Sequence, residues 1–268
     1  MRRQELFGVE GVRWVPERAS GTGVLVFGGS SGRVDTARAE LLARHGAVAE
    51  SIRWFGGAGQ HEGPWEIAIE LFLSRVQELA TVCDRIIVVG TSFGSEAALL
   101  TGAHSTHVSA VVAFAPSDVV WTGVTAQGRA TSHWTLNGRV VPHVPFINGW
   151  EPAGDPPEFV HFYRECRAHF PEHVHDAAIP VERIRHVVVV AGGDDRVWPA
   201  LTHAEAIAER RRWHGMATTV VTDPDAGHRT ILPGEVPASG GIRMLRGGND
   251  AADRRLGNEA WRHLVALL

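Results

Sequence analysis

Short apolar segments alternate with segments of helical character along most of this chain, and this alternation limits the folds open to it. The apolar segments predict strands at residues 23–27, 47–54, 85–89, 108–114, 186–191 and 217–222. Helices are predicted between and after them, at residues 37–45, 64–82, 92–100, 201–213 and 258–268. Strands rich in valine and isoleucine that are joined through helices favour a mostly parallel central sheet flanked by helices. We therefore expect an α/β fold, with residues 1–268 forming one domain.

Two stretches interrupt this alternation, residues 115–180 and residues 223–257. Loops of such length are uncommon in a compact domain unless they are functional. The first stretch is rich in aromatic side chains, namely Trp121, Trp134, Trp150, Phe159, Phe162 and Tyr163. We interpret residues 116–180, approximately, as a cap inserted over the edge of the sheet where ligands bind.

The composition excludes several classes of protein. The 26 basic residues are all arginine, so a phosphate loop ending in Gly-Lys, a lysine Schiff base and a Ser-Lys dyad are impossible. The formal net charge is −4, and no arginine cluster exceeds Arg210–Arg212. We therefore expect no nucleic-acid partner.

Localisation signals are also lacking. Cys83 and Cys166 fit neither a disulfide framework nor a zinc motif. Residues 1–20 have no apolar core of a signal peptide, and the longest apolar runs are too short to span a bilayer. The sequence predicts a cytoplasmic protein with no membrane partner.

The segment Gly90-Thr91-Ser92-Phe93-Gly94 lies between a predicted strand and a predicted helix. A nucleophilic serine on such a turn needs small residues two positions away on either side, so that the backbone can turn sharply. The helix that follows directs its positive end at the site. Five residues make a short pattern, and an ordinary glycine-rich turn is the alternative. Its context favours Ser92 as a nucleophile.

A nucleophilic serine requires a histidine base and a carboxylate that orients it. In α/β-hydrolases the order along the chain is serine, acid, histidine, with the acid and histidine after late strands. Asp194 and Asp195 follow the strand predicted at 186–191, and His228 follows the last predicted strand. The spacing Gly-x-x-Asp selects Asp195, and Asp194 stays open as the alternative. We predict an α/β-hydrolase fold with the catalytic residues Ser92, Asp195 and His228.

The oxyanion hole of such a site is built from backbone N–H groups. We expect one from Phe93, directly after the nucleophile, and another from Gly29 or Ser30, after the first buried strand. A dinucleotide-binding loop is the alternative for residues 28–32, but their glycines do not follow the Gly-x-Gly-x-x-Gly register.

Several segments resemble the C-terminal catalytic domain shared by acyl-CoA thioesterases and bile acid-CoA:amino acid N-acyltransferases. The similar segments, besides the serine turn, are residues 27–32, 41–46, 132–139, 179–184, 226–228 and 247–252. The resemblance implies acyl transfer from a thioester of coenzyme A or a carrier protein, through an acyl-Ser92 intermediate. His228 would then activate water or an amine to release the acyl group. The family uses serine or cysteine, and Ser92 favours hydrolysis.

Other features have two interpretations. Trp121 and Trp134 could line an acyl pocket or pack within the cap. The cluster His169, His173, His175 and Asp176 could bind a metal, but its spacing is non-specific and a polar cap surface is favoured. We therefore expect no metal and no cofactor.

Two further functions remain open on the sequence alone. Bacterial relatives of this shape also resemble dienelactone hydrolases, so the chain could be a carboxylester or lactone hydrolase. It could also be a hydrolase-like binding protein without activity, but the complete set of Ser92, Asp195 and His228 argues against that.

Overall fold

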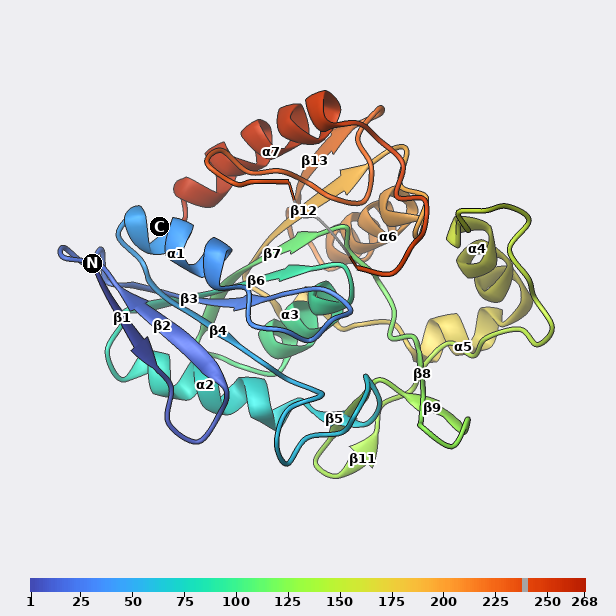
Figure 1. The fold of residues 1–268 in the computed structure, drawn as a ribbon, viewed down its shortest axis with the longest axis horizontal. Helices are drawn as coiled ribbons and strands as arrows, with labels where there is room; N and C mark the ends of the chain where they lie inside the picture. The colour runs from blue at the N-terminus through green and yellow to red at the C-terminus, as the bar shows by residue number, and fades with distance from the viewer. Residues whose placement is uncertain (238–240) are drawn as a thin grey trace.

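The computed structural model describes residues 1–237 and 241–268 (Figure 1). Its main sheet has eight strands in the order β1-β2-β4-β3-β6-β7-β12-β13. The strands are β1 (Arg2–Glu5), β2 (Gly11–Val15), β3 (Thr22–Phe27), β4 (Val48–Ile52), β6 (Arg85–Thr91), β7 (Val108–Phe114), β12 (His186–Gly192) and β13 (Thr219–Asp223). β2 pairs antiparallel with β1 and with β4, and every other neighbouring pair of this sheet is parallel. The predicted mostly parallel sheet is confirmed.

The central strands are apolar on both faces because helices cover both faces. Successive side chains of a strand point to opposite sides, so neighbouring residues enter different halves of the core. On β6, Ile86 and Val88 pack into one core layer, whereas Ile87 and Val89 pack into the other. The sheet therefore separates two apolar layers.

Each layer is closed by its own helices. α1 (Thr36–Arg44) and α7 (Asp250–Val265) cover one face, with Leu42 and Leu256 buried there. α2 (Glu70–Ala80), α3 (Phe93–Ala103) and α6 (Ala200–Trp213) cover the other. The helices flank the sheet as predicted.

Two predicted helix boundaries are wrong. The helix expected from residue 64 begins at Glu70, because Ile67–Ala68 forms a short strand, β5, that pairs with β10 (Trp134–Leu136). Pairing with this distant segment outweighs the local helical spacing. The last helix begins at Asp250 rather than at 258, with Asn249 as its N-cap.

The segment 116–180 contains short strands and two helices. These are β8 (Thr122–Val124), β9 (Ala130–Ser132), β10, β11 (Arg139–Val140), α4 (Val160–His169) and α5 (Pro171–Asp176), followed by the 3₁₀ helix Val181–Arg183. In Figure 1, the β8–β9 hairpin, α4 and α5 lie beyond the carboxyl ends of β6 and β7. The backbone N–H groups of Phe159 and Val160 donate to Arg196 O, at 3.0 and 3.2 Å, and so join α4 to the loop after β12.

In the two ranges that the structure describes, no helix combines the length and the apolar character needed to cross a bilayer.

Candidate active site

The three residues predicted to be catalytic follow three parallel strands of the main sheet. Ser92 follows β6, Asp195 follows β12 and His228 follows β13. Because the carboxyl ends of parallel strands meet at one edge of the sheet, the side chains can converge although they are far apart in the chain.

Ser92 occupies a sharp turn between β6 and α3. Its φ is 57° and its ψ is −123°, a backbone conformation that favours glycine and is strained for a serine. Two backbone hydrogen bonds hold it there: Ser92 N–H donates to Phe114 O at 2.8 Å, and Ser95 N–H donates to Ser92 O at 2.7 Å. The turn holds the Ser92 side chain at the end of the strand.

The glycines on either side of Ser92 are required by close backbone contact. A Cβ at Gly90 would lie 2.0 Å from Gly94 O, and a Cβ at Gly94 would lie 2.1 Å from Gly28 O. Any larger residue would separate α3 from β6 or from the loop after β3. This steric requirement explains the Gly-x-Ser-x-Gly pattern.

A hydrogen-bonded chain joins the three residues. His228 Nε2 lies 2.8 Å from Ser92 Oγ, and His228 Nδ1 lies 2.7 Å from Asp195 Oδ2. Asp195 and His228 are buried, with 5% and 8% of their surface exposed. With the proton on Nδ1, the imidazole donates to Asp195 and accepts from the Ser92 hydroxyl, as a base acting on that hydroxyl must.

The adjacent aspartates have different surroundings. Asp195 Oδ1 accepts from the N–H groups of Val197 and Trp198, at 2.8 and 3.2 Å, while Oδ2 contacts His228. Asp194 instead accepts from Gly248 N–H at 2.9 Å and from Arg196 Nε at 2.6 Å. The Gly248 N–H, together with Arg196, holds the pKa of Asp194 below its ordinary value. The geometry therefore selects Asp195 as the partner of His228.

The loop that carries His228 is fixed by a residue that the sequence did not single out. Asp253 on α7 accepts from Gly227 N–H at 2.7 Å, and His228 N–H donates to Arg246 O at 2.9 Å. Burial raises the pKa of Asp253, and the Gly227 N–H only partly offsets this effect. The segment 247–252, which carried part of the family resemblance, leads directly into Asp253 and was the available signal.

The predicted oxyanion residues lie around the turn. A Cβ at Gly29 would lie 3.7 Å from Ser92 Cβ, so the backbone of Gly29 passes beside the nucleophile. Phe93 is the first residue of α3, and Ser30 is exposed. Gly29 and Phe93 are thus both placed close to Ser92.

The two tryptophans predicted to line a pocket are buried. Trp121 and Trp134 have no exposed surface. Trp121 Nε1 donates to Ser117 Oγ at 3.0 Å, and Trp134 Nε1 donates to Glu96 Oε2 at 3.0 Å. In this structure both rings pack in the core rather than line an open pocket, and their contact with a substrate stays a prediction.

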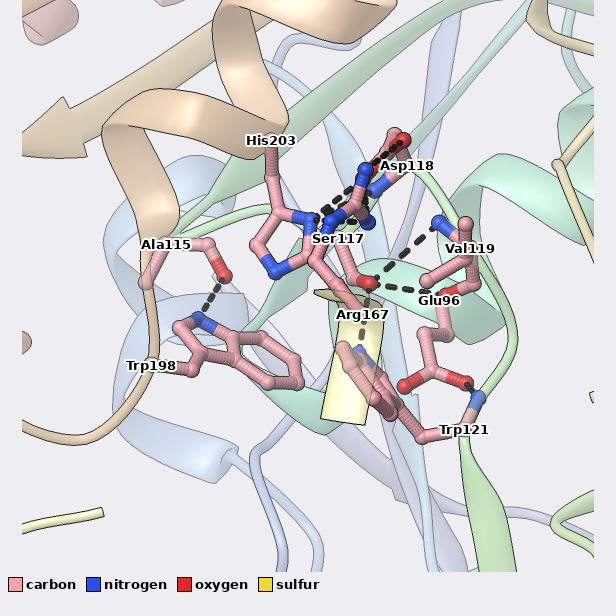
Figure 2. A network of polar contacts seen from close by, with 9 residues as sticks. All are labelled: Glu96, Ala115, Ser117, Asp118, Val119, Trp121, Arg167, Trp198 and His203. Carbon is pink, nitrogen blue, oxygen red and sulfur yellow. Dashed lines mark hydrogen bonds and ion pairs between the residues drawn. The ribbon is translucent and has the colours of Figure 1, made fainter. Parts of the chain in front are cut away.

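A partly buried polar cluster is formed by Asp118, Arg167 and His203 (Figure 2). The Asp118 carboxylate, after β7, binds Arg167 of α4 through two contacts of 2.8 and 3.1 Å and also contacts His203 Nδ1 of α6. Burial by itself raises the pKa of Asp118, but His203 and Arg167 outweigh it, so the pKa lies below its ordinary value. The cluster ties segment 116–180 to α6, and no sequence motif indicated it.

Trp198 connects this cluster with the candidate site. Its Nε1 donates to Ala115 O at 3.1 Å (Figure 2). The centroid of its ring lies 5.8 Å from that of the His203 ring and 6.0 Å from that of the His228 ring.

Possible metal ligands do not converge in the described part of the chain. No group of three or more His, Cys, Asp or Glu side chains there is arranged to hold a metal ion. Of the cluster at residues 169–176, His175 contacts Asp176 at 3.2 Å on the surface.

Comparison with solved structures identifies the fold of this protein. One similar structure, described as a dienelactone hydrolase from Klebsiella pneumoniae, has a TM-score of 0.55 and 14% identity, covering 97% of this chain and 92% of that one. Esterase 2 of Thermogutta terrifontis has a TM-score of 0.55 and 13% identity, covering 98% and 92%. A hormone-sensitive lipase from a metagenome library has a TM-score of 0.54 and 15% identity, covering 98% and 84%. The protein has the α/β-hydrolase fold.

The family follows from the sequence. The profile described as "BAAT / Acyl-CoA thioester hydrolase C terminal" matches residues 67–266, and the chain belongs to this family. The match confirms the resemblance to the acyl-CoA thioesterase family that the sequence segments indicated. Comparison with curated proteins finds no match.

Proposed function

We propose that this protein is a serine-dependent acyl-thioester hydrolase or acyltransferase that works through an acyl-Ser92 intermediate. The observation that carries the proposal is the chain of hydrogen bonds from Ser92 Oγ through His228 to Asp195. Membership of the acyl-CoA thioester hydrolase family supports a thioester as the substrate.

The first half-reaction forms the acyl-enzyme. Ser92 Oγ attacks the thioester carbonyl carbon while its proton passes to His228 Nε2, and the buried Asp195 stabilises the resulting imidazolium. The N–H groups of Phe93 and Gly29 bind the oxyanion. The C–S bond then breaks, and His228 returns the proton to the sulfur, so that a thiol leaves.

The second half-reaction releases the acyl group. His228 takes a proton from the acceptor, which attacks the Ser92 ester through a second oxyanion. The bond between the acyl carbon and Ser92 Oγ then breaks, and His228 returns the proton to Oγ. We propose water as the acceptor, which gives a free carboxylic acid, and an amine as the alternative, which gives an amide.

A carboxylester or lactone hydrolase is the second candidate. The same three residues can cleave an oxygen ester, and the fold is similar to that of structures described as a dienelactone hydrolase and an esterase. The two candidates differ in the leaving group, a thiol or an alcohol.

The experiment offers both substrate classes to one preparation. Acyl-CoAs of graded chain length are followed by thiol release, and p-nitrophenyl esters by phenolate release, with and without amino-acid acceptors. We expect thioesters to be turned over with the higher kcat/KM. Thioester cleavage at the uncatalysed rate beside rapid ester hydrolysis would establish the second candidate instead.

The nucleophile is tested separately. Rapid quenching followed by intact-mass measurement and peptide mapping should locate the acyl group on Ser92. Ser92→Ala should keep the fold and lose turnover, and unchanged activity in this variant would refute the mechanism.

The cellular setting is part of the proposal. A coenzyme A or carrier-protein thioester is the partner we propose, and the cytoplasm is the location. Fractionation of the native host, with detection by antibody, tests the location.

A further inference from the structure

Glu96 is a buried carboxylate on the same helix as the candidate nucleophile. It follows Ser92 by four positions, about one turn of α3, and has no exposed surface. Its Oε1 has no hydrogen-bond partner among the described residues, and the ion pair found for it there is with His133. A buried carboxylate without close cationic partners is costly, so its surroundings need an explanation.

The other carboxylate oxygen of Glu96 joins segment 116–180 to α3. Oε2 accepts from Trp134 Nε1 at 3.0 Å and from Trp121 N–H at 3.3 Å, the latter drawn in Figure 2. His133 Nδ1 lies 3.5 Å from the same oxygen. One oxygen of Glu96 therefore contacts the side chains of both His133 and Trp134.

These two rings enclose the side chain of Phe93. The Trp134 ring stacks on the Phe93 ring at 4.8 Å and an angle of 23°, and the His133 ring meets it edge-on at 4.0 Å. Trp54 stacks on Trp134 at 5.5 Å. Trp54 and Phe55 also pack on the Phe93 ring, at 5.0 and 6.5 Å. The other two ring neighbours, His133 and Trp134, both contact a single oxygen of Glu96.

We propose that Glu96 is a positioning residue for the oxyanion-binding N–H of Phe93. It fixes Trp134 and His133, these fix the Phe93 ring, and the ring fixes the first peptide of α3 beside Ser92. This inference rests on the proposed function. Since a displacement of about 1 Å at a reacting centre can cost about 100-fold in rate, loss of this support should be visible in kcat.

The test compares Glu96→Leu with Glu96→Gln. Leucine removes the acceptor, so we expect kcat to fall about 10- to 100-fold, with KM within about threefold of the wild-type value. Glutamine keeps an acceptor oxygen for Trp134, so we expect it to retain at least about a third of the wild-type kcat. Equal losses in the two variants would overturn the proposal.

A second measurement reports on the oxyanion site directly. An alkyl trifluoromethyl ketone forms a tetrahedral adduct with the serine. The affinity of the Glu96→Leu variant for this inhibitor should fall by about the same factor as its kcat/KM. A loss of kcat with unchanged affinity for this inhibitor would contradict the role assigned to Glu96.

Glu50→Gln is the matched control. Glu50 is equally buried but lies on β4, where it binds Arg75 at 2.8 Å and also Arg13. We expect this variant to lose thermal stability and keep its kcat. If Glu96→Leu does not fold, Trp134→Phe replaces it, because phenylalanine keeps a ring on Phe93 but removes the donor. A wild-type kcat in that variant would overturn the inference.

The Ser92→Ala variant distinguishes failure of the proposed function from failure of the role proposed for Glu96. Full activity in Ser92→Ala would overturn the proposed function and this inference together. Loss of activity there, with wild-type kcat in Glu96→Leu, would overturn this inference alone.

Discussion

His228 Nδ1 lies 2.7 Å from Asp195 Oδ2, whereas the carboxylate of the adjacent Asp194 binds Arg196 and Gly248. Two neighbouring aspartates thus have separate partners, and only one of them orients the histidine.

Asp195→Asn should lower kcat by about 10⁴-fold, because the amide can donate to His228 and so stabilise the wrong tautomer. Asp194→Asn should change kcat less than about threefold, since it alters contacts with Arg196 and Gly248 alone. Steady-state kinetics of the two variants at neutral pH make the comparison. The reverse order of effects would identify Asp194 as the acid.

The backbone strain at Ser92 predicts a stability difference between two inactive variants. Glycine relieves the positive φ, which costs about 1–3 kcal/mol for other residues, but loses about 0.5–1 kcal/mol through the greater freedom of the unfolded chain. We therefore expect Ser92→Gly to be more stable than Ser92→Ala by about 0.5–2 kcal/mol. Urea unfolding measures the difference, and a more stable alanine variant would argue against strain at this turn.

The close approach at Gly94 predicts a coupled loss of stability and activity. An added Cβ would lie 2.1 Å from Gly28 O, so α3 must move away from the loop that carries Gly29. We expect Gly94→Ala to lose about 1–3 kcal/mol of stability together with most of its kcat. Thermal unfolding and kinetics test this. Gly154→Ala is the control, since the nearest atom of the described residues to a Cβ there would be Pro156 O, at 3.7 Å. Its stability and its kcat should stay at their wild-type values.

Asp118 predicts a pH-dependent part of the stability. Because its pKa is lowered on folding, its contribution is complete above the ordinary value of 3.8 and is lost as the pH falls through the lower folded value. Asp118→Asn should be less stable than the wild type at pH 7, by about 3 kcal/mol or more, since it leaves Arg167 and His203 without the carboxylate. Urea unfolding between pH 7 and pH 3 should show that the difference in unfolding free energy between the wild type and Asp118→Asn becomes smaller below about pH 4. A difference that stays the same at every pH would contradict the lowered pKa of Asp118 in the folded protein.

The central strands and the residues at their ends were predictable because the signals are local. The strands at Ile86–Val89 and Val187–Ala191 are continuous apolar runs, and Ser92 and Asp195 lie three and four residues after the ends of these two strands. The close approaches at Gly90 and Gly94 leave a readable spacing in the sequence. These features depend mainly on residues that are close together in the sequence.

Other features depend on partners distant in the sequence and gave no local signal. Ile67 was predicted to be helical but pairs with Trp134, and α7 begins at Asp250, eight residues before its predicted start at 258. A Cβ at Gly257 would lie 1.8 Å from Ile231 O, so this glycine reflects tight packing rather than a helix boundary. Glu96 became notable only when its burial and its contact with Trp134 were known.

The contact between Ser92 and His228 joins residues 136 positions apart in the chain. The histidine loop is further held by Asp253, which lies on the last helix. Until residue 228 has been synthesised, Ser92 has no histidine base beside it. On the proposed mechanism, turnover therefore requires the histidine loop to be held in place by the carboxyl-terminal helix.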